Sequence, residues 1–467
     1  MLRQWNIKIE LDSDNKQVPL YKQLADQIQH MIESGILKSG ELLPSGREIA
    51  LQLQISRKTV LSAMEQLVFS GWLENRERVG LFVRNPKELT KRGQQHQSIP
   101  QQPVLPAVAP TPSLIIDDGF PDTQLLPFKS LSSAFRQFFN QAARFQMLGY
   151  SNPTGNSKLR STLAQGVCHE RGLQASEEQL MLTRGSQQAL YLVSHALLHP
   201  GDTIVMEAPG YHNARHAFES AGLRVLSIQV DEDGLQTDAL SKLLTKEPTI
   251  KALYVTPRYQ YPTTVTLSAK RRREVADLVN KYNLLVVEDD FGFHFQFTEH
   301  YTKPLSVLLP QSHYVYIGTF SKILAPALRL GFMVTTPDYI HRMGEYRQFM
   351  DMQGDNVMER AILDLIETGE LKRHIRRASK IYRERLQFAC QLIKYELGNK
   401  VHFKKPHGGL ALWLELPSDL TKDLAQCGIA AKIEPLPNHR FGMRVGYASM
   451  QNEQIELLVK TLKKIIK

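Results

Sequence analysis

The feature that most constrains this chain is a stretch rich in Pro, Gln and Ser. Residues 85–113, NPKELTKRGQQHQSIPQQPVLPAVAPTPS, have neither the spacing of an amphipathic helix nor the alternation of a strand. This composition is typical of a semi-extended linker. It divides the 467 residues into a small segment, 1–84, and a large one, 114–467. The large segment exceeds the roughly 250–300 residues at which a single core stops growing, so we expect it to have two lobes.

Composition narrows the class of protein. Hydrophobic residues make up 42% and charged residues 22%, as in a folded globular protein. The net charge of +10 weakly favours an anionic partner such as nucleic acid. The three cysteines are far apart and form no CxxC, so we expect a reducing cytoplasm and neither a disulfide framework nor a metal site. We also expect no signal peptide and no membrane span, because long apolar runs are missing from the sequence.

The small segment reads as three helices and a hairpin. An i, i+4 apolar stripe predicts a helix over Leu20–Glu33. A capping box at Ser45–Glu48 opens a second helix, and Ser56 can cap a third. Residues 72–74 and 81–84 can then pair as a hairpin. This order predicts a winged helix-turn-helix; the alternative is a small helical bundle with solvated basic residues.

Basic and hydroxyl side chains gather at the starts of the second and third helices. Helix N-termini and Arg or Lys side chains suit DNA phosphates, and the start of the third helix can reach base edges in the major groove. At the hairpin turn a glycine lets the backbone approach DNA closely. The predicted DNA-contacting residues are Arg47, Ser56, Arg57, Lys58, Thr59, Arg78 and Gly80.

In the large segment, short apolar runs alternate with helical patterns. Runs such as 284–287 and 314–317 are apolar on both faces, as in buried parallel strands. Helical patterns such as 269–282 lie between the runs, which predicts an α/β doubly wound layout. Beyond about Asn356 the chain is mainly helical and then mixed, so we expect a separate C-terminal lobe. The other predicted strands are 203–206 and 252–255.

One lysine follows a predicted strand. Lys322 ends the text IGTFSK, and a lysine at the end of a strand can form a Schiff base with an aldehyde cofactor. Thr319, Ser321 and Arg329 offer hydroxyls and a guanidinium for a phosphate. The alternative for this motif alone is an ordinary surface lysine.

Two further motifs fit the same chemistry. Asp289 lies where a predicted strand ends, and a carboxylate there can keep a pyridine nitrogen protonated. The text TRGSQQ, residues 183–188, precedes a helical pattern, so its small residues can free backbone N–H groups for an anion. Taken singly, the first can be a loop acid and the second an ordinary serine cap.

The small segment resembles the GntR family of bacterial regulators. The matching text is PLYKQLADQI, LPSGREIA, ISRKTVLSAMEQLVFSGWLE and GLFV, within residues 18–84. The hairpin departs from the family, which usually has Gly-x-Gly-Thr before Phe-Val; only Gly80 survives here.

The large segment resembles the fold-type I aminotransferases that use pyridoxal 5′-phosphate (PLP). The resemblance implies that Lys322 is the Schiff-base lysine and Asp289 the partner of the pyridine nitrogen. It implies that Tyr211 stacks on the cofactor ring, Tyr150 reaches the phosphate of the neighbouring subunit, and Arg444 grips a substrate carboxylate. The implied phosphate contacts are Gly185, Ser186, Gln187, Thr319, Ser321 and Arg329.

The joint layout is similar to that of the MocR-type regulators. It implies a DNA-binding head over residues 1–84 and a PLP-binding, dimerising body over 114–467. We therefore expect a cytoplasmic, head-to-tail homodimer that binds a double-stranded DNA operator. A small amine or amino acid would displace Lys322 by aldimine formation and shift a conformational balance. An active aminotransferase with a DNA-binding head and a cofactor-free regulator are the alternatives.

The chain departs from the aminotransferase pattern in two places. Phe291 stands where the family has a tyrosine that donates to the cofactor O3′, and Tyr261 takes the place of a second O3′ neighbour. Arg258, Tyr259 and Thr264 replace the family's Ser, His and Gly. We expect cofactor binding with weak or partial transaminase chemistry, and an influence of these positions on the effector.

Overall fold

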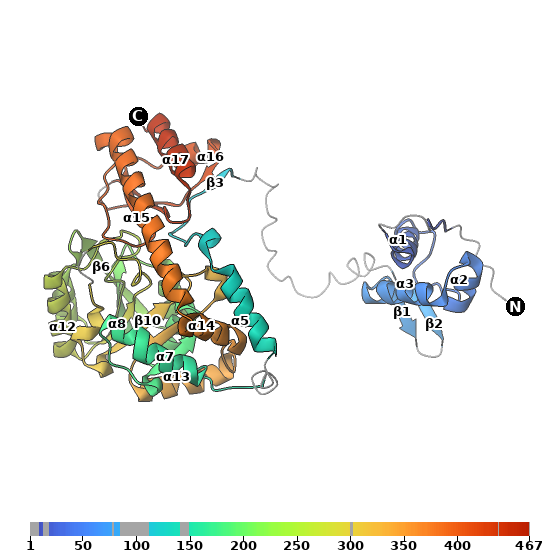
Figure 1. The fold of residues 1–467 in the computed structure, drawn as a ribbon, viewed down its shortest axis with the longest axis horizontal. Coiled ribbons are helices and arrows are strands. Elements are labelled where there is room, and N and C mark those ends of the chain that lie inside the picture. Colours follow the sequence, from blue (N-terminus) through green and yellow to red (C-terminus); the bar gives the residue numbers. More distant parts are fainter. Residues whose placement is uncertain are drawn as a thin grey trace. The chain divides into compact units, whose positions relative to one another are not determined.

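The structure is a computed structural model. It describes residues 9–12, 18–76, 79–84, 112–140, 149–298, 302–437 and 439–466. The chain forms two compact units, residues 1–109 and 110–467 (Figure 1). The predicted linker falls almost entirely outside the described residues.

The first unit contains three helices and a hairpin, as predicted. The helices are α1 (Leu20–Glu33), α2 (Gly46–Leu53) and α3 (Arg57–Phe69). The antiparallel strands are β1 (Leu73–Arg76) and β2 (Gly80–Val83). This is a winged helix-turn-helix.

Apolar spacing and capping explain these helices. Leu24 and Ile28 lie one turn apart on α1 and are buried with Leu67 of α3 in one cluster. Ser45 and Glu48 form the predicted capping box: Ser45 N–H donates to Glu48 Oε2 at 2.8 Å, and Glu48 N–H donates to Ser45 Oγ at 3.3 Å. These bonds satisfy two N–H groups that the first turn of α2 leaves without helical partners.

The second unit is built on an eight-stranded sheet of order β4-β11-β10-β9-β8-β5-β6-β7. The strands β10, β9, β8, β5 and β6 are mutually parallel, and the four predicted apolar runs are confirmed as β5, β8, β9 and β10. The strand β11 runs antiparallel to both its neighbours, and β7 to β6, so the sheet is mixed. Their bounds are β4 Leu180–Thr183, β5 Thr203–Ala208, β6 Arg224–Asp231, β7 Gly234–Leu235, β8 Ile250–Val255, β9 Leu285–Asp289, β10 Tyr314–Thr319 and β11 Gly331–Val334.

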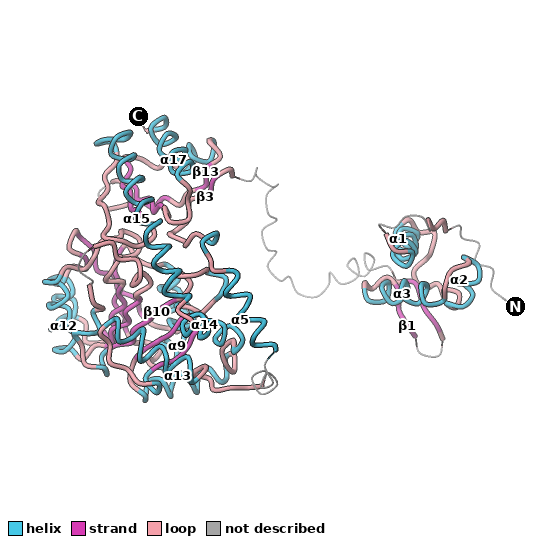
Figure 2. The backbone as a smooth tube through the Cα atoms, viewed as in Figure 1, coloured by secondary structure: helices cyan, strands magenta, loops and turns pink. Residues whose placement is uncertain are grey.

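Helices lie on both sides of this sheet (Figure 2). Alternate residues of a strand point to opposite faces, so Val286 and Val287 of β9 belong to two different apolar clusters. The predicted α/β class is therefore confirmed. The helices of this lobe are α5 Phe128–Asn140, α7 Ser157–Thr162, α8 His169–Arg171, α9 Ser186–Ala196, α10 His212–Ser220, α11 Thr237–Lys246, α12 Ala269–Tyr282, α13 Pro337–Met350 and α14 Asn356–Glu367.

A smaller lobe follows, but it begins later than predicted. The helix α14 buries Ile362 and Leu365 in the core of the large lobe, so the prediction of a boundary near Asn356 was wrong. The long helix α15 (Glu370–Leu397) instead packs its second half into the core of the small lobe. The remaining elements are β12 Leu412–Leu416, α16 Thr421–Gln426, β13 Ile429–Ala430, β14 Ile433–Pro435, β15 Phe441–Val445 and α17 Asn452–Ile465.

The start of this unit pairs with the small lobe. The short strand β3 (Leu114–Ile115) runs parallel to β13, and Leu114 and Ile116 are buried in the core of the small lobe. This pairing sets the course of the segment that follows, Asp117–Phe120. No helix within the described ranges is both long and apolar enough to span a membrane.

Candidate functional site

The candidate site lies at the carboxyl ends of two adjacent parallel strands. Asp289 is the last residue of β9 and is paired with Ile317 of β10, five residues before Lys322. A cavity of about 350 Å³ opens there, as expected for an open α/β sheet. Of the residues predicted for cofactor and effector, those that line it are Lys322, Asp289, Ser186, Gln187, Tyr211, Tyr261, Thr319, Ser321, Arg329 and Arg444.

Asp289 forms the floor of the cavity. Its Oδ1 accepts a hydrogen bond from Ser186 Oγ at 3.3 Å, and its Oδ2 one from Tyr254 Oη at 3.4 Å. Burial raises the pKa of Asp289 to about 7, against the lowering effect of Ser186. A protonated ring nitrogen beside this carboxylate would favour its ionised form.

Lys322 lies three residues beyond the end of β10 and lines the same cavity. Its Nζ donates to Gly119 O at 2.8 Å and lies 4.9 Å from the centre of the Phe120 ring. Burial, and then the charge of Arg444, lower the pKa of Lys322 to about 8. A larger fraction of the amine is therefore unprotonated near neutral pH, and that is the form that attacks an aldehyde.

The start of α9 and Arg329 form a compact basic end of the cavity. Gly185 precedes α9 with φ +78°, and a Cβ there would lie 3.2 Å from the Arg329 guanidinium, so the position requires glycine. Arg329 is held by donating from Nη2 to Arg184 O at 2.7 Å. Backbone N–H groups at a helix start together with a guanidinium suit a phosphate.

Two buried polar atoms of this cavity lack partners in the described part of the chain, and one of them, the Ser321 hydroxyl, supports a bound phosphate ester. Ser321 Oγ and Gln187 Oε1 are buried and have no hydrogen-bond partner among the described residues. A buried polar atom without a partner costs roughly 1–3 kcal/mol. Because the hydroxyl of Ser321 can donate to a phosphate oxygen, the residues present fit a phosphate-bearing cofactor.

The opposite wall carries Arg444 and Tyr261. Arg444 donates from Nε to Asp118 O at 3.0 Å and from Nη1 to Pro262 O at 2.6 Å, and its guanidinium lies 5.0 Å from the Tyr261 ring centre. The Tyr261 hydroxyl donates to Asp118 Oδ2 at 3.2 Å. Its proton is therefore directed at this carboxylate, and its expected place beside the cofactor O3′ stays a prediction.

Six residues that line the cavity were not predicted from the sequence: Asp118, Phe120, Asn213, Tyr254, Thr256 and Pro326. Tyr254 could have been found, because it is a polar-tipped residue in an apolar strand next to that of Asp289. Asp118 and Phe120 had no local signal, since the pairing of β3 with the small lobe brings them here.

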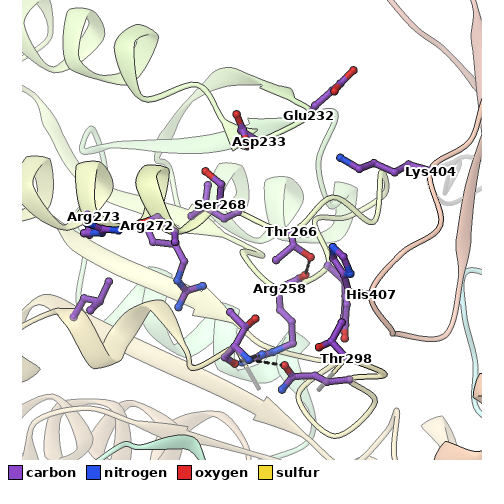
Figure 3. A pocket seen from close by; sticks show the side chains of 16 residues that line it. Glu232, Asp233, Arg258, Thr266, Ser268, Arg272, Arg273, Thr298, Lys404 and His407 are labelled. Atoms are coloured by element: carbon purple, nitrogen blue, oxygen red, sulfur yellow. Dashed lines mark hydrogen bonds between the residues drawn. The ribbon is translucent and has the colours of Figure 1, made fainter. Parts of the chain in front are cut away.

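Arg258 does not line this cavity, and its expected influence on the effector stays a prediction. Its guanidinium is buried against Asp290. Arg258 instead lines a larger pocket of about 670 Å³, where Figure 3 shows it near Thr266 and His407. Thr264 is buried with φ +63°, a conformation that explains the family's glycine at this place.

Tyr150 lies outside the cavity and is 85% exposed. Its role in a neighbouring subunit stays a prediction.

Five of the predicted DNA-contacting residues lie at the starts of α2 and α3: Arg47, Ser56, Arg57, Lys58 and Thr59. Arg47, Arg57 and Lys58 are exposed. Ser56 caps α3, with its Oγ accepting from Thr59 N–H at 3.1 Å and lying 2.8 Å from Thr59 Oγ1. These two hydroxyls therefore stabilise the helix start that carries the basic residues.

The hairpin supplies the other two predicted DNA-contacting residues, Arg78 and Gly80. Gly80 has φ +133°, and a Cβ there would lie 3.0 Å from Leu42 Cδ1, so backbone conformation and packing already require glycine. Arg78 lies outside the described residues.

Each of the two compact units is similar to a known protein family. Residues 120–462 match the family model for aminotransferase class I and II, and residues 20–83 match the gntR family of bacterial regulatory proteins. Across 97% of its length the chain is 29% identical to the uncharacterised HTH-type transcriptional regulator YhdI of Bacillus subtilis, covering 97% of it. It is 26% identical to the probable rhizopine catabolism regulatory protein MocR of Rhizobium meliloti, covering 97% of this chain and 94% of that one.

A solved structure extends the comparison to the cofactor. The α-aminoadipate aminotransferase LysN of Thermus thermophilus, complexed with N-(5′-phosphopyridoxyl)-L-leucine, is similar with a TM-score of 0.67 and 28% identity, over 75% of this chain and 91% of that one. Together, the gntR match implies DNA binding and the aminotransferase match implies pyridoxal phosphate. This chain therefore belongs to the aminotransferase class I and II family and, through its GntR head, to the MocR-type subfamily of GntR-family transcriptional regulators.

Proposed function

We propose that this protein is a transcriptional regulator that senses a primary amine or amino acid through PLP bound in its large unit. The observation that carries the proposal is one cavity that joins Lys322, Asp289 and Arg329 in a chain with a winged helix-turn-helix. Residues 1–84 would bind an operator and residues 114–467 would bind the cofactor and dimerise. A regulator with a DNA target would work in the cytoplasm.

The chain supplies a position for each part of the cofactor. Ser321, Arg329 and the start of α9 would hold the phosphate, and Asp289 would hold the ring nitrogen. PLP, when bound, supplies an aldehyde that condenses reversibly with primary amines. Lys322 would hold the cofactor until an effector amine replaces it.

The remaining walls select and orient the effector. Arg444 presents a guanidinium whose Nη2 makes no hydrogen bond within the described residues, so it can bind a carboxylate. The amine would meet the cofactor beside Lys322. An effector can shift the balance of two protein states only by binding one of them better.

The test is the amine dependence of DNA binding. PLP-loaded protein is titrated onto DNA from upstream of its own gene, with and without a panel of primary amines. We expect at least one amine to change the affinity, and Lys322→Ala to bind the same DNA without any response. Borohydride reduction followed by peptide mapping should place the pyridoxyl label on Lys322. A label on another lysine, or a response that survives in Lys322→Ala, would contradict the proposal.

A second candidate function is an aminotransferase that carries a DNA-binding head. The observation that favours it is the complete set of Lys322, Asp289 and Arg444 around one cavity. Formation of an oxo acid from an amino acid in the presence of an oxo-acid acceptor would support it. Phe291, which lines the cavity without a hydroxyl, favours the regulatory function.

A further inference from the structure

We infer that Asp118 makes this cavity selective for primary amines that carry a second cationic nitrogen, a class that contains diamines and basic amino acids. The inference rests on the proposed function, because it names the effector class of the same site. It concerns a residue that has no local sequence signal and that the fold places opposite the cofactor floor.

Two neighbouring acids show why Asp118 is available. Asp117 is fully engaged in structure: its Oδ1 accepts from the N–H groups of Gly119 and Phe120 at 2.7 and 2.8 Å, and its Oδ2 accepts from Ser449 Oγ at 2.6 Å. Among the described residues, Asp118 accepts one side-chain hydrogen bond, from Tyr261 Oη to Oδ2 at 3.2 Å. Within the described residues its Oδ1 has no partner, while the residue lines the cavity.

The cations nearby do not neutralise Asp118 by direct contact. Arg444 approaches the backbone O of Asp118, and its second donor goes to Pro262 O. The amine of Lys322 donates to Gly119 O. In the described part of the chain, neither cation forms a salt bridge with the Asp118 carboxylate, which leaves this carboxylate able to pair with a cationic ligand.

The acid at the other end of the cavity is committed elsewhere. Asp289 accepts from Ser186 and Tyr254 and lies where the cofactor ring nitrogen would bind. Asp118 lies on the opposite wall of the cavity, beside Tyr261 and Arg444, where the effector would bind. A ligand cation there would be partly removed from water, where a charge-assisted hydrogen bond is stronger than at an open surface.

An effector can therefore make two contacts that a simple monoamine cannot. Its reacting amine would lie beside Lys322, and its second cationic nitrogen would donate to Asp118 Oδ1. A basic amino acid would also place its carboxylate on Arg444, whereas a diamine would leave Arg444 unused. The same wall would repel an effector whose side chain is acidic.

The experiment is a visible-absorbance titration of the full-length, PLP-loaded protein with four probes. The probes are 1,4-diaminobutane and lysine, with n-butylamine and norleucine as partners that lack the second nitrogen. We expect each dication to bind roughly 10- to 100-fold more tightly than its partner, the range of a hydrogen bond between charged groups. A loss of affinity for lysine in Arg444→Gln, with none for the diamine, would assign the effector to the basic amino acids; the diamine binding more tightly than lysine would assign it to the diamines.

The decisive variant is Asp118→Asn, which keeps the size of the side chain and an acceptor for Tyr261. It should abolish the preference for a second nitrogen while the pyridoxyl label stays on Lys322. Glu232→Gln is the matched control, because it makes the same charge change at an exposed residue of the other pocket. Glu232→Gln should prefer probes with a second nitrogen to the same extent as the unsubstituted protein.

The outcomes separate the two proposals. If monoamines change the spectrum and dications bind no more tightly, or if Asp118→Asn retains the preference, the inference about Asp118 is wrong and amine sensing stands. If no amine changes the spectrum of protein whose Lys322 is labelled by borohydride, amine sensing itself is wrong, and this inference is overturned with it.

Discussion

The guanidinium of Arg258 and the carboxylate of Asp290 form a buried two-point ion pair, with Nε 2.7 Å from Oδ1 and Nη2 2.9 Å from Oδ2. Arg258 is 4% exposed and Asp290 2% exposed. The Tyr316 hydroxyl also donates to Asp290 Oδ2 at 3.0 Å. Burial alone would raise the pKa of Asp290, but Arg258 and these hydrogen bonds hold it below its usual value.

Arg258→Ala should lower the free energy of unfolding by roughly 3–5 kcal/mol, because it leaves Asp290 buried without its cation. Urea unfolding at pH 7 measures this loss. Arg224→Ala is the control: it removes a surface pair with Glu247 and should cost less than about 1 kcal/mol. A similar, small loss for both variants would contradict a structural role for Arg258.

The same pair predicts a pH dependence. The pKa of Asp290 is lower in the folded protein than in the unfolded chain, where it is about 3.9. The stability that Asp290 contributes is therefore present above its pKa in the unfolded chain and is lost as pH falls through its pKa in the folded protein. In Arg258→Ala the pKa of Asp290 should be raised by burial, so the difference in unfolding free energy between the unsubstituted protein and Arg258→Ala should be largest at alkaline pH and shrink as pH falls through that raised pKa.

In PLP-free protein, the contribution of Asp289 to the unfolding free energy should change with pH in the opposite direction to that of Asp290. Its folded pKa of about 7 lies above the unfolded value, so the stability it contributes is fully present below about pH 4 and is lost as pH rises to 7. Asp289→Asn should therefore stabilise the PLP-free protein at pH 8, by up to about 4 kcal/mol, while weakening PLP binding. Urea unfolding at pH 5 and pH 8 tests this.

Two comparisons make that test specific. Glu207 is also buried with a pKa raised to about 7 by burial, so some of the pH dependence should remain in Asp289→Asn. Asp277→Asn, at an exposed position of α12, should leave the unfolding free energy unchanged at both pH values. If Asp289→Asn were less stable than the unsubstituted protein at pH 8, burial of the ionised Asp289 carboxylate would not be destabilising, and the prediction would be wrong.

Phe291→Tyr should lower the pKa of the visible chromophore of PLP-loaded protein by about one unit. Phe291 lines the cavity, and a phenol there can donate to the cofactor O3′ and stabilise its deprotonated form. Near neutral pH the unsubstituted protein should hold the protonated, longer-wavelength form. A spectral pH titration measures both, with Phe128→Tyr on the exposed surface of α5 as the control. Coincident curves for Phe291→Tyr and the unsubstituted protein would show that Phe291 does not face O3′.

Arg57→Ala should cost roughly 1–3 kcal/mol of binding to the operator and relax specificity at one base position, because Arg57 is exposed at the first residue of α3. Arg78→Ala should weaken binding evenly across sequences and reduce the salt dependence by about one phosphate contact. Binding curves at several salt concentrations, on operator and unrelated DNA, separate the two effects. Lys460→Ala, on the other compact unit, should change neither.

If Tyr150 acts in the neighbouring subunit, two different variant subunits should restore PLP binding to each other in a mixed dimer. If Tyr150 completes the phosphate site of the partner, Tyr150→Ala should lower PLP affinity roughly tenfold, the loss of one hydrogen bond to a charged group. In a mixed dimer of Tyr150→Ala and Lys322→Ala, one site carries both changes and the other carries neither. Mixed samples should therefore recover tight binding in one site per mixed dimer, measured by absorbance at limiting PLP. No recovery, or a monomer by sedimentation, would contradict the shared site.

Much of this protein was determined by local sequence. Apolar spacing placed α1 and α12, and a four-residue capping box placed the start of α2, because such signals act between neighbours in the chain. The glycine before α9 was predicted from the motif, and its φ of +78° shows why no other residue fits. The buried parallel strands were legible because both their faces are apolar.

Only the tertiary structure decided what three consecutive acids do. Glu288, Asp289 and Asp290 read alike in sequence, yet Glu288 accepts from the backbone of Ser306, Asp289 faces the cofactor cavity, and Asp290 pairs with Arg258. Side chains alternate across a strand, so the partner of each is set by what packs on its face and not by its neighbours in the chain.

The same reason explains Asp118. Nothing near it in sequence marks a ligand site, and its partner Tyr261 is 143 residues away. The pairing of β3 with β13 carries it to the wall of the cavity. Sequence determined the kind of cofactor this protein holds, because that chemistry lies in short contiguous motifs. The long-range packing of β3 against the small lobe decided that Asp118 lines the cavity, because that contact joins segments with no common local signal.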